Sequence, residues 1–305
     1  MRLALSLVLV VASAACDLGK VTVNTTSKVL VRALPSLQQE SDYELARQAI
    51  PGTLKTIEGF WIVDPDNPRL IKLLTNGYCQ YGTGFVEDDW EAARLEKDLP
   101  ATEYHNERST KIFNRCLNYA LRTLGKRWQR DLFGDRDTVA RLLKEDGGSG
   151  KRFAMMYAAY ALASIVNHNT TRMEMLAYIP TVEMIMNHLI ELDQKRMPED
   201  LVHAALPYVA LGMLHTGRPA AMGGEPDRAR GYFEQALTVT GGKFLLARAL
   251  MAFRVGLAKG DRKFFHDQLK QVLETNPAVW PEQRLANEIA HRKARRYLSK
   301  EKELF

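Results

Sequence analysis

Cys16 is the residue whose neighbours most clearly indicate a chemistry. It follows the small residues Ser13-Ala14-Ala15, which end a thirteen-residue apolar run that begins at Leu3 behind Met1-Arg2. The run is too short to span a bilayer and has the form of a signal peptide, here predicted over 1–15. A Cys directly after such a run is typical of bacterial lipoproteins. We therefore predict lipid attachment at Cys16 and a periplasmic protein held at a bacterial membrane.

Two alternatives to lipid attachment come from the same residues. A lipoprotein pattern normally has Leu or another branched residue three positions before the Cys, and this chain has Ser13 there. Ordinary cleavage after Ala15 would leave a free thiol at Cys16, and an uncleaved segment is the other alternative. Asp17 resembles an inner-membrane retention signal of some bacteria, but the sequence does not decide between inner and outer membrane.

The segment that follows the candidate lipid site is short and polar. It lacks helical periodicity from Asp17 to Ser27. This composition predicts a flexible tether over 16–27 and one folded domain over 28–305.

Two further cysteines, Cys79 and Cys116, lie within apolar helical patterns. They could pair in an oxidising compartment, but we expect each to be a small buried hydrophobic residue. No CxxC motif or cluster of histidines accompanies them, so no metal site is expected.

Catalytic and nucleotide-binding motifs are absent from the sequence. It contains no HExxH, GxSxG, GxGxxG or phosphate-binding loop, and its seven histidines are scattered singly. A net charge of +6 spread over 305 residues gives no sign of a nucleic-acid partner. We therefore predict a protein that is not an enzyme and has no cofactor, metal or nucleic-acid partner.

Amphipathic segments and short turns alternate from about residue 40 onward. The run Asp64-Pro65-Asp66-Asn67-Pro68 predicts a turn between two helices. We expect Pro51-Gly52 to interrupt the first of these helices and Pro180 to lie in the first turn of a later one. Residues 229–237 match the second helix of a tetratricopeptide unit, and a similar pattern returns 36 residues later. The sequence predicts an all-α, tetratricopeptide-like solenoid of helical hairpins in one compact domain.

Aromatic and methionine side chains provide the candidates for an apolar binding surface. Seven of the eleven methionines lie between Met155 and Met197, and flexible thioethers fill cores or line adaptable binding surfaces. Tetratricopeptide folds bind on their concave face. The candidates for a groove or pore lining are Trp61, Tyr78, Tyr81, Phe85, Met155 and Met156.

Four separated motifs resemble the T component (TatT) of tripartite ATP-independent periplasmic (TRAP) transporters. They are "ELARQAIPGTLKTIEGFWIVDPDNPRLIKLLTNGY", "GGEPDRARGYFEQAL", "GGKFLLARALMAF" and "RLANEIAHRKAR", in consistent order from Ser41 to Leu298. The family's turn elements fall on 64–68 and on Gly223-Gly224-Glu225-Pro226, with Glu225 in place of the commoner Asp.

The resemblance implies a periplasmic lipoprotein that works beside a substrate-binding protein and membrane permease subunits. It further implies a homotrimer with a pore or hydrophobic passage. The leading hypothesis is thus a non-enzymatic accessory component of a TRAP-type solute transport system, which docks the substrate-binding protein and conducts an apolar ligand. The alternative is a tetratricopeptide lipoprotein scaffold for envelope protein assembly.

Overall fold

The structure is a computed structural model that describes residues 2–217 and 223–305, with side chains from Leu18 onward. The described chain is helical and contains no β-strand, as the sequence predicts. The longer helices are α1 (Arg2–Ala33), α3 (Tyr43–Val63), α4 (Pro68–Tyr81), α5 (Glu87–Leu95), α6 (Leu99–Leu124), α8 (Arg136–Asp146), α9 (Arg152–Asn167), α11 (Ile179–Lys195), α12 (Leu201–Thr216), α13 (Pro226–Val239), α14 (Leu245–Lys259), α15 (Arg262–Glu274) and α16 (Arg284–Ser299). Shorter helical segments are α2 (Pro35–Gln38), η1 (Gly82–Val86), α7 (Lys126–Asp131), η2 (Ser149–Lys151), α10 (Met173–Leu176), η4 (Pro277–Val279), η5 (Pro281–Gln283) and α17 (Glu301–Leu304).

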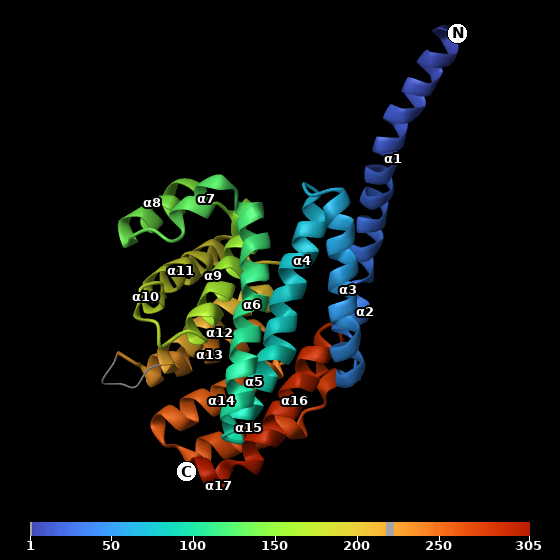
Figure 1. Ribbon diagram of the computed structural model, residues 1–305. Helices are drawn as coiled ribbons and strands as arrows, with labels where there is room; N and C mark the ends of the chain where they lie inside the picture. The colour runs from blue at the N-terminus through green and yellow to red at the C-terminus, as the bar shows by residue number, and fades with distance from the viewer. Residues whose placement is uncertain (1, 218–222) are drawn as a thin grey trace.

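Successive long helices pack side by side, as in a solenoid of helical hairpins (Figure 1). The order of contact follows the chain from α3 to α4, α6, α9, α11, α12, α13, α14 and α15. Helix α16 then packs against α14 and α15. This confirms the predicted all-α solenoid.

Local sequence signals start the helices where expected. Asp42 caps α3, and its side chain accepts hydrogen bonds from the backbone N–H groups of Glu44 and Leu45. Asn67 caps α4, and Pro68 occupies its first turn. Pro180 lies in the first turn of α11, as predicted.

Helix α16 closes the solenoid onto its N-terminal helices. It contacts α2 and α3, and three of its basic side chains reach the buried carboxylate of Asp88 on α5. The N–O distances to Asp88 are 3.1 Å from Arg292, 3.1 Å from Lys293 and 2.6 Å from Arg296. The C-terminal part of the chain therefore packs directly against its N-terminal helices.

Residues of the predicted flexible tether are helical. Helix α1 continues to Ala33 and packs on α3 and α4 through the buried side chains of Val23 and Ser27. Asn24 also accepts a hydrogen bond of 3.0 Å from Arg69. The β-branched residues of this stretch have low helix propensity, so tertiary packing stabilises a helix that local sequence does not predict.

Pro51-Gly52 does not interrupt α3, contrary to the prediction. The helix runs from Tyr43 to Val63 with Pro51 inside it. Its buried stripe continues on both sides of the proline, with Ile50 before it and Leu54 after it. Burial along this stripe offsets the cost of about 3 kcal/mol that an interior proline imposes.

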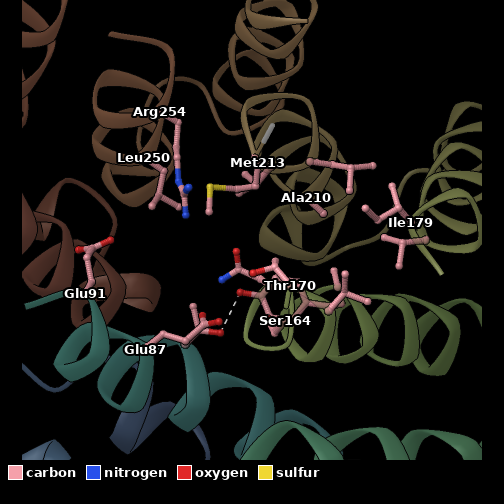
Figure 2. A pocket seen from close by; sticks show the side chains of 18 of the residues that line it. Glu87, Glu91, Ser164, Thr170, Ile179, Ala210, Met213, Leu250 and Arg254 are labelled. Carbon is pink, nitrogen blue, oxygen red and sulfur yellow. Dashed lines mark hydrogen bonds between the residues drawn. The ribbon is translucent and has the colours of Figure 1, made fainter. Parts of the chain in front are cut away.

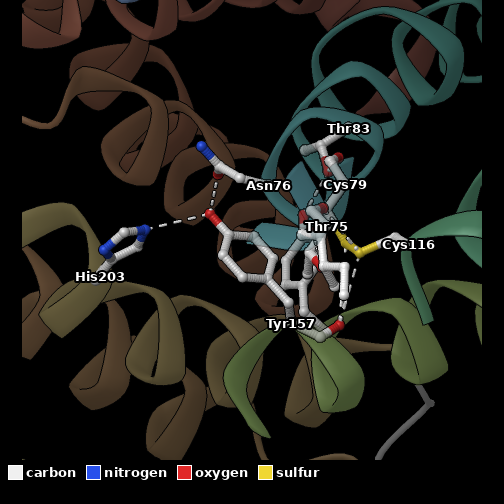
Figure 3. Close-up of a disulfide and its surroundings, with 9 residues drawn as sticks. Thr75, Asn76, Cys79, Thr83, Cys116, Tyr157 and His203 are labelled. Carbon is white, nitrogen blue, oxygen red and sulfur yellow. Dashed lines mark hydrogen bonds between the residues drawn. A yellow bond between two sulfur atoms is a disulfide. The ribbon is translucent and has the colours of Figure 1, made fainter. Parts of the chain in front are cut away.

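Cys79 on α4 and Cys116 on α6 form a disulfide, so the prediction of two unpaired buried thiols is wrong (Figure 3). Both side chains are fully buried, beside Tyr157 of α9. The sequence leaves their pairing open as an alternative, because cysteines 37 residues apart on different helices meet only once those helices are packed. Packing of α4 on α6 brings their Cα atoms to 5.4 Å, within the range that a disulfide spans.

Candidate functional site

A π-helical turn, η1, joins α4 to α5 and contributes to the centre of the molecule. Such turns are rare and often occur at functional sites. A Cβ on Gly84 would lie only 2.9 Å from Ile289 Cδ1 of α16, so glycine allows α16 to approach the turn. The same turn places Thr83 and Phe85 in the walls of internal cavities.

The first cavity, which we call the Met213 cavity, has a volume of about 180 Å³. Its wall is mostly apolar and comes from helices on opposite sides of the solenoid (Figure 2). The apolar lining residues are Trp90, Ala163, Val166, Leu176, Ile179, Val182, Val209, Ala210, Met213, Leu214, Leu246 and Leu250.

A second cavity, the Phe85 cavity, has a volume of about 160 Å³ and lies among α3, α4, α12, α14 and α16. It shares Thr83, Tyr160 and Leu246 with the Met213 cavity. The hydroxyl groups of Thr83 and Tyr160 are hydrogen-bonded at 2.8 Å. These three residues therefore form a common wall between two apolar cavities.

The third cavity, the Leu257 cavity, has a volume of about 510 Å³ between α5, α14 and α17. It shares Trp90, Glu91, Gly217 and Arg254 with the Met213 cavity. The three cavities thus form a series, with the Met213 cavity in the middle.

The carboxylate of Glu91 lies where the Met213 and Leu257 cavities meet. It accepts hydrogen bonds from Lys293 at 2.8 Å and from the Tyr297 hydroxyl at 2.7 Å, and it pairs with Arg296. Burial raises the pKa of Glu91, but the charges of Lys293 and Arg296 more than offset this and hold it below its ordinary value. Glu91 is therefore an ionised, fully partnered group and not a proton donor.

Glu87 is the other carboxylate in the wall of the Met213 cavity. Its Oε1 lies 3.0 Å from Nε2 of His168, a buried residue of the α9 C-terminus. His168 Nδ1 in turn lies 2.8 Å from the side-chain oxygen of Asn106, and the Trp90 ring packs edge-on against the imidazole. These contacts hold α5, α6 and α9 together.

The aromatic candidates divide between the cavities and other parts of the fold. Tyr81 and Phe85 line the Phe85 cavity. Trp61 lies elsewhere, where its indole N–H donates to the Pro65 carbonyl at 3.0 Å. Tyr78 stacks on Tyr119 and lines none of the three cavities.

Met155 and Met156 are fully buried in the core and line none of the three cavities. The methionine in a cavity wall is Met213, outside the methionine-rich stretch.

The predicted turn residues have capping roles. Residues 64–67 separate α3 from α4. Gly223 has a φ of +83°, a left-handed conformation that glycine adopts readily. Glu225 is the N-cap residue of α13 and Pro226 its first residue, and Pro226 also lines the Leu257 cavity. The side chain of Cys16 lies outside the described residues, so lipid attachment there stays a prediction.

Several cavity residues, among them Tyr160, Leu246 and Arg254, were not predicted from the sequence. A weak signal existed for two of them. Tyr160 carries a hydroxyl within the apolar stretch 153–166, and Arg254 interrupts the apolar stretch 244–258. A polar group inside a buried helical pattern indicates a partner or a cavity, but its position becomes clear only when the helices are packed.

The fold and site define the chain as an all-α helical-hairpin protein with a series of three neighbouring cavities, two of them largely apolar. Among the described residues, no helix has the length and apolar character to cross a membrane, and no group of three or more His, Cys, Asp or Glu is arranged to hold a metal. The family model of the TRAP transporter T-component matches residues 39–305, and the chain belongs to this family. Membership gives it an accessory role in TRAP transport and a location in the cell envelope. No curated protein matches the chain.

Proposed function

We propose that the protein docks a periplasmic substrate-binding protein of a TRAP-type system and conducts an apolar ligand through its internal cavities. The observation that carries the conduction step is the common wall of Thr83, Tyr160 and Leu246 between the Met213 and Phe85 cavities. A ligand that moved between them would have to displace only this wall. Because most of the lining is apolar, each step exchanges one apolar environment for another.

The common wall acts as a constriction in this proposal. One hydrogen bond of 2.8 Å, between Thr83 and Tyr160, holds its polar part together. Such a bond contributes only about 1 kcal/mol net. In this proposal, side-chain rotation at Tyr160 and Leu246 opens the wall.

We further propose that the protein is anchored in the periplasm through lipid on Cys16. The disulfide between Cys79 and Cys116 supports export, because such bonds persist in oxidising compartments. Replacing Cys16 with Ala should release the protein to the soluble fraction of its native envelope, and continued membrane retention would contradict lipid at that residue.

Docking of a substrate-binding protein and assembly as a homotrimer rest on family membership. Chemical crosslinking of the chain with a co-produced binding protein of its own TRAP system tests docking, and native mass spectrometry gives the stoichiometry. A monomer that captures no binding protein would refute both. A non-enzymatic role is supported by Glu87 and Glu91, the acids of the Met213 cavity wall, which are both engaged by basic side chains.

The experiment for conduction measures uptake of an apolar fluorescent dye, N-phenyl-1-naphthylamine. We expect dye binding to the unmodified chain and a strong loss in Leu246→Trp, because a larger ring at the common wall narrows both cavities. Leu99→Trp is the matched control, since Leu99 is 78% exposed on α6. Equal dye binding by the unmodified chain and Leu246→Trp would overturn the proposed passage. The apolar lining of the Met213 and Phe85 cavities favours this function over an envelope scaffold, for which a polar concave groove would be expected.

A further inference from the structure

Arg254 on α14 carries a positive charge at the junction of the Met213 and Leu257 cavities. Its Nε atom is buried and has no hydrogen-bond partner among the described residues. Figure 2 shows the side chain of Arg254 extending into the Met213 cavity from the side opposite Glu87. Arg254 itself is partly exposed, so the rest of its guanidinium is open to the cavity, and an anion bound there would satisfy the buried Nε donor.

The acids near Arg254 do not serve as its partners. Glu91 is bound by Lys293, Arg296 and Tyr297. Glu87 pairs with His168. Each acid in the wall of the Met213 cavity thus already has a hydrogen-bond partner other than Arg254.

Arg94 places a second cation beside the same junction. It lines the Leu257 cavity together with Arg254, and its guanidinium lies 4.7 Å from the ring centroid of Trp90. Burial and the nearby charge of Arg254 lower the pKa of Arg94. An anion between the two guanidinium groups would relieve their repulsion and satisfy the Nε of Arg254.

We propose that Arg254 and Arg94 bind the head group of an amphiphilic carboxylate whose hydrocarbon tail occupies the Met213 cavity. Guanidinium groups match the planar, two-oxygen geometry of a carboxylate, and the apolar wall beyond Arg254 suits an alkyl chain. This inference rests on the proposed passage of an apolar ligand and adds that the ligand carries a negative charge at one end.

The test compares decanoate with 1-decanol, which has the same chain length and no charge, as competitors that displace N-phenyl-1-naphthylamine from the full chain. On the unmodified protein, decanoate should displace the dye at a lower concentration than 1-decanol. In Arg254→Met the concentration of decanoate needed should rise by about 10- to 100-fold, the loss expected for charge-assisted hydrogen bonds, while that of 1-decanol stays constant. Arg248→Met is the matched control on α14, because Arg248 bonds Gln268 and Gln271 and lines none of the three cavities.

Stability provides a second readout that separates binding from folding. Because Arg254 lacks a partner, Arg254→Met should have an unchanged or higher Tm, whereas loss of a structural arginine would lower it. Arg94→Met should show the same selective loss of decanoate binding, by a smaller factor, and gives the answer if Arg254→Met unfolds.

Three results would overturn the carboxylate site, and one of them would also overturn the apolar passage. Equal displacement by decanoate and 1-decanol, or unchanged decanoate displacement in Arg254→Met, refutes the carboxylate site and leaves the apolar passage intact. Failure of the unmodified chain to bind the dye refutes the passage and the carboxylate site together.

Discussion

Reduction of the Cys79–Cys116 disulfide should destabilise the protein by an amount that follows from the loop it closes. The two cysteines are 37 residues apart, and closing a loop of that size removes about 13 cal/mol/K of entropy from the unfolded chain. At 25 °C this corresponds to a loss of about 4 kcal/mol in the free energy of unfolding on reduction. For a chain of 305 residues, the Tm should fall by about 6 °C.

The measurement is urea unfolding followed by circular dichroism of a Cys16→Ser chain, with and without dithiothreitol. Because Cys79 and Cys116 are buried, the reductant is added to the unfolded chain before refolding. Alkylation of the denatured but unreduced chain should modify neither cysteine, and a Cys79→Ala/Cys116→Ala variant should not respond to dithiothreitol. Equal urea midpoints for oxidised and reduced protein, or two alkylated thiols, would refute the assigned bond and the export that it supports.

Three further predictions concern the closure of the solenoid and one helix cap. Lys293→Met should lower the free energy of unfolding, measured by urea titration, by about 3–5 kcal/mol, because it leaves Asp88 and Glu91 buried with one cation fewer. The control Lys270→Met, at an exposed ion pair on α15, should change it by less than about 1 kcal/mol. Similar losses in the two variants would contradict the role of burial. Burial raises the pKa of Asp88, but Lys293 and its other basic neighbours lower it by more, so the folded pKa lies well below the ordinary 3.8. The stabilising contribution of Asp88 is then present above about pH 4 and is lost as the pH falls below that value, which urea midpoints measured between pH 6 and pH 3 will show. An Asp88→Asn variant with the same pH profile would exclude this group. Asn67→Ala should cost about 1 kcal/mol, because it removes the N-cap of α4, and an unchanged Tm would show that the cap is dispensable.

The sequence alone predicts the fold class of this protein and many of its helix starts. The all-α class follows from amphipathic spacing, which reports the face that each helix buries whatever its partner is. Caps such as Asp42 and Asn67 are also local, because the side chain bonds backbone groups two or three residues away. Amphipathic spacing and helix caps depend only on nearby residues, so both can be recognised without knowledge of the rest of the chain.

The tertiary structure decided the features that join residues far apart in the chain. The disulfide pairs Cys79 with Cys116, and the buried cluster joins Asp88 to basic residues of α16 more than 200 positions later. Helix packing also extended α1 through a segment of low helix propensity and carried α3 through Pro51. In each case burial against a distant helix outweighs a local preference.

The candidate site likewise contains some residues that the sequence could select and others that only the packed structure identifies. Tyr81 and Phe85 could be selected from the sequence because aromatic residues on a solenoid helix are candidates for its concave face. Met155 and Met156 could not be distinguished from cavity residues, since a filled core and a cavity wall are equally apolar. Arg254 became meaningful only when α5, α12 and α14 enclosed the space around it, because whether a charge has a partner is a property of the packed helices and not of the helix that carries it.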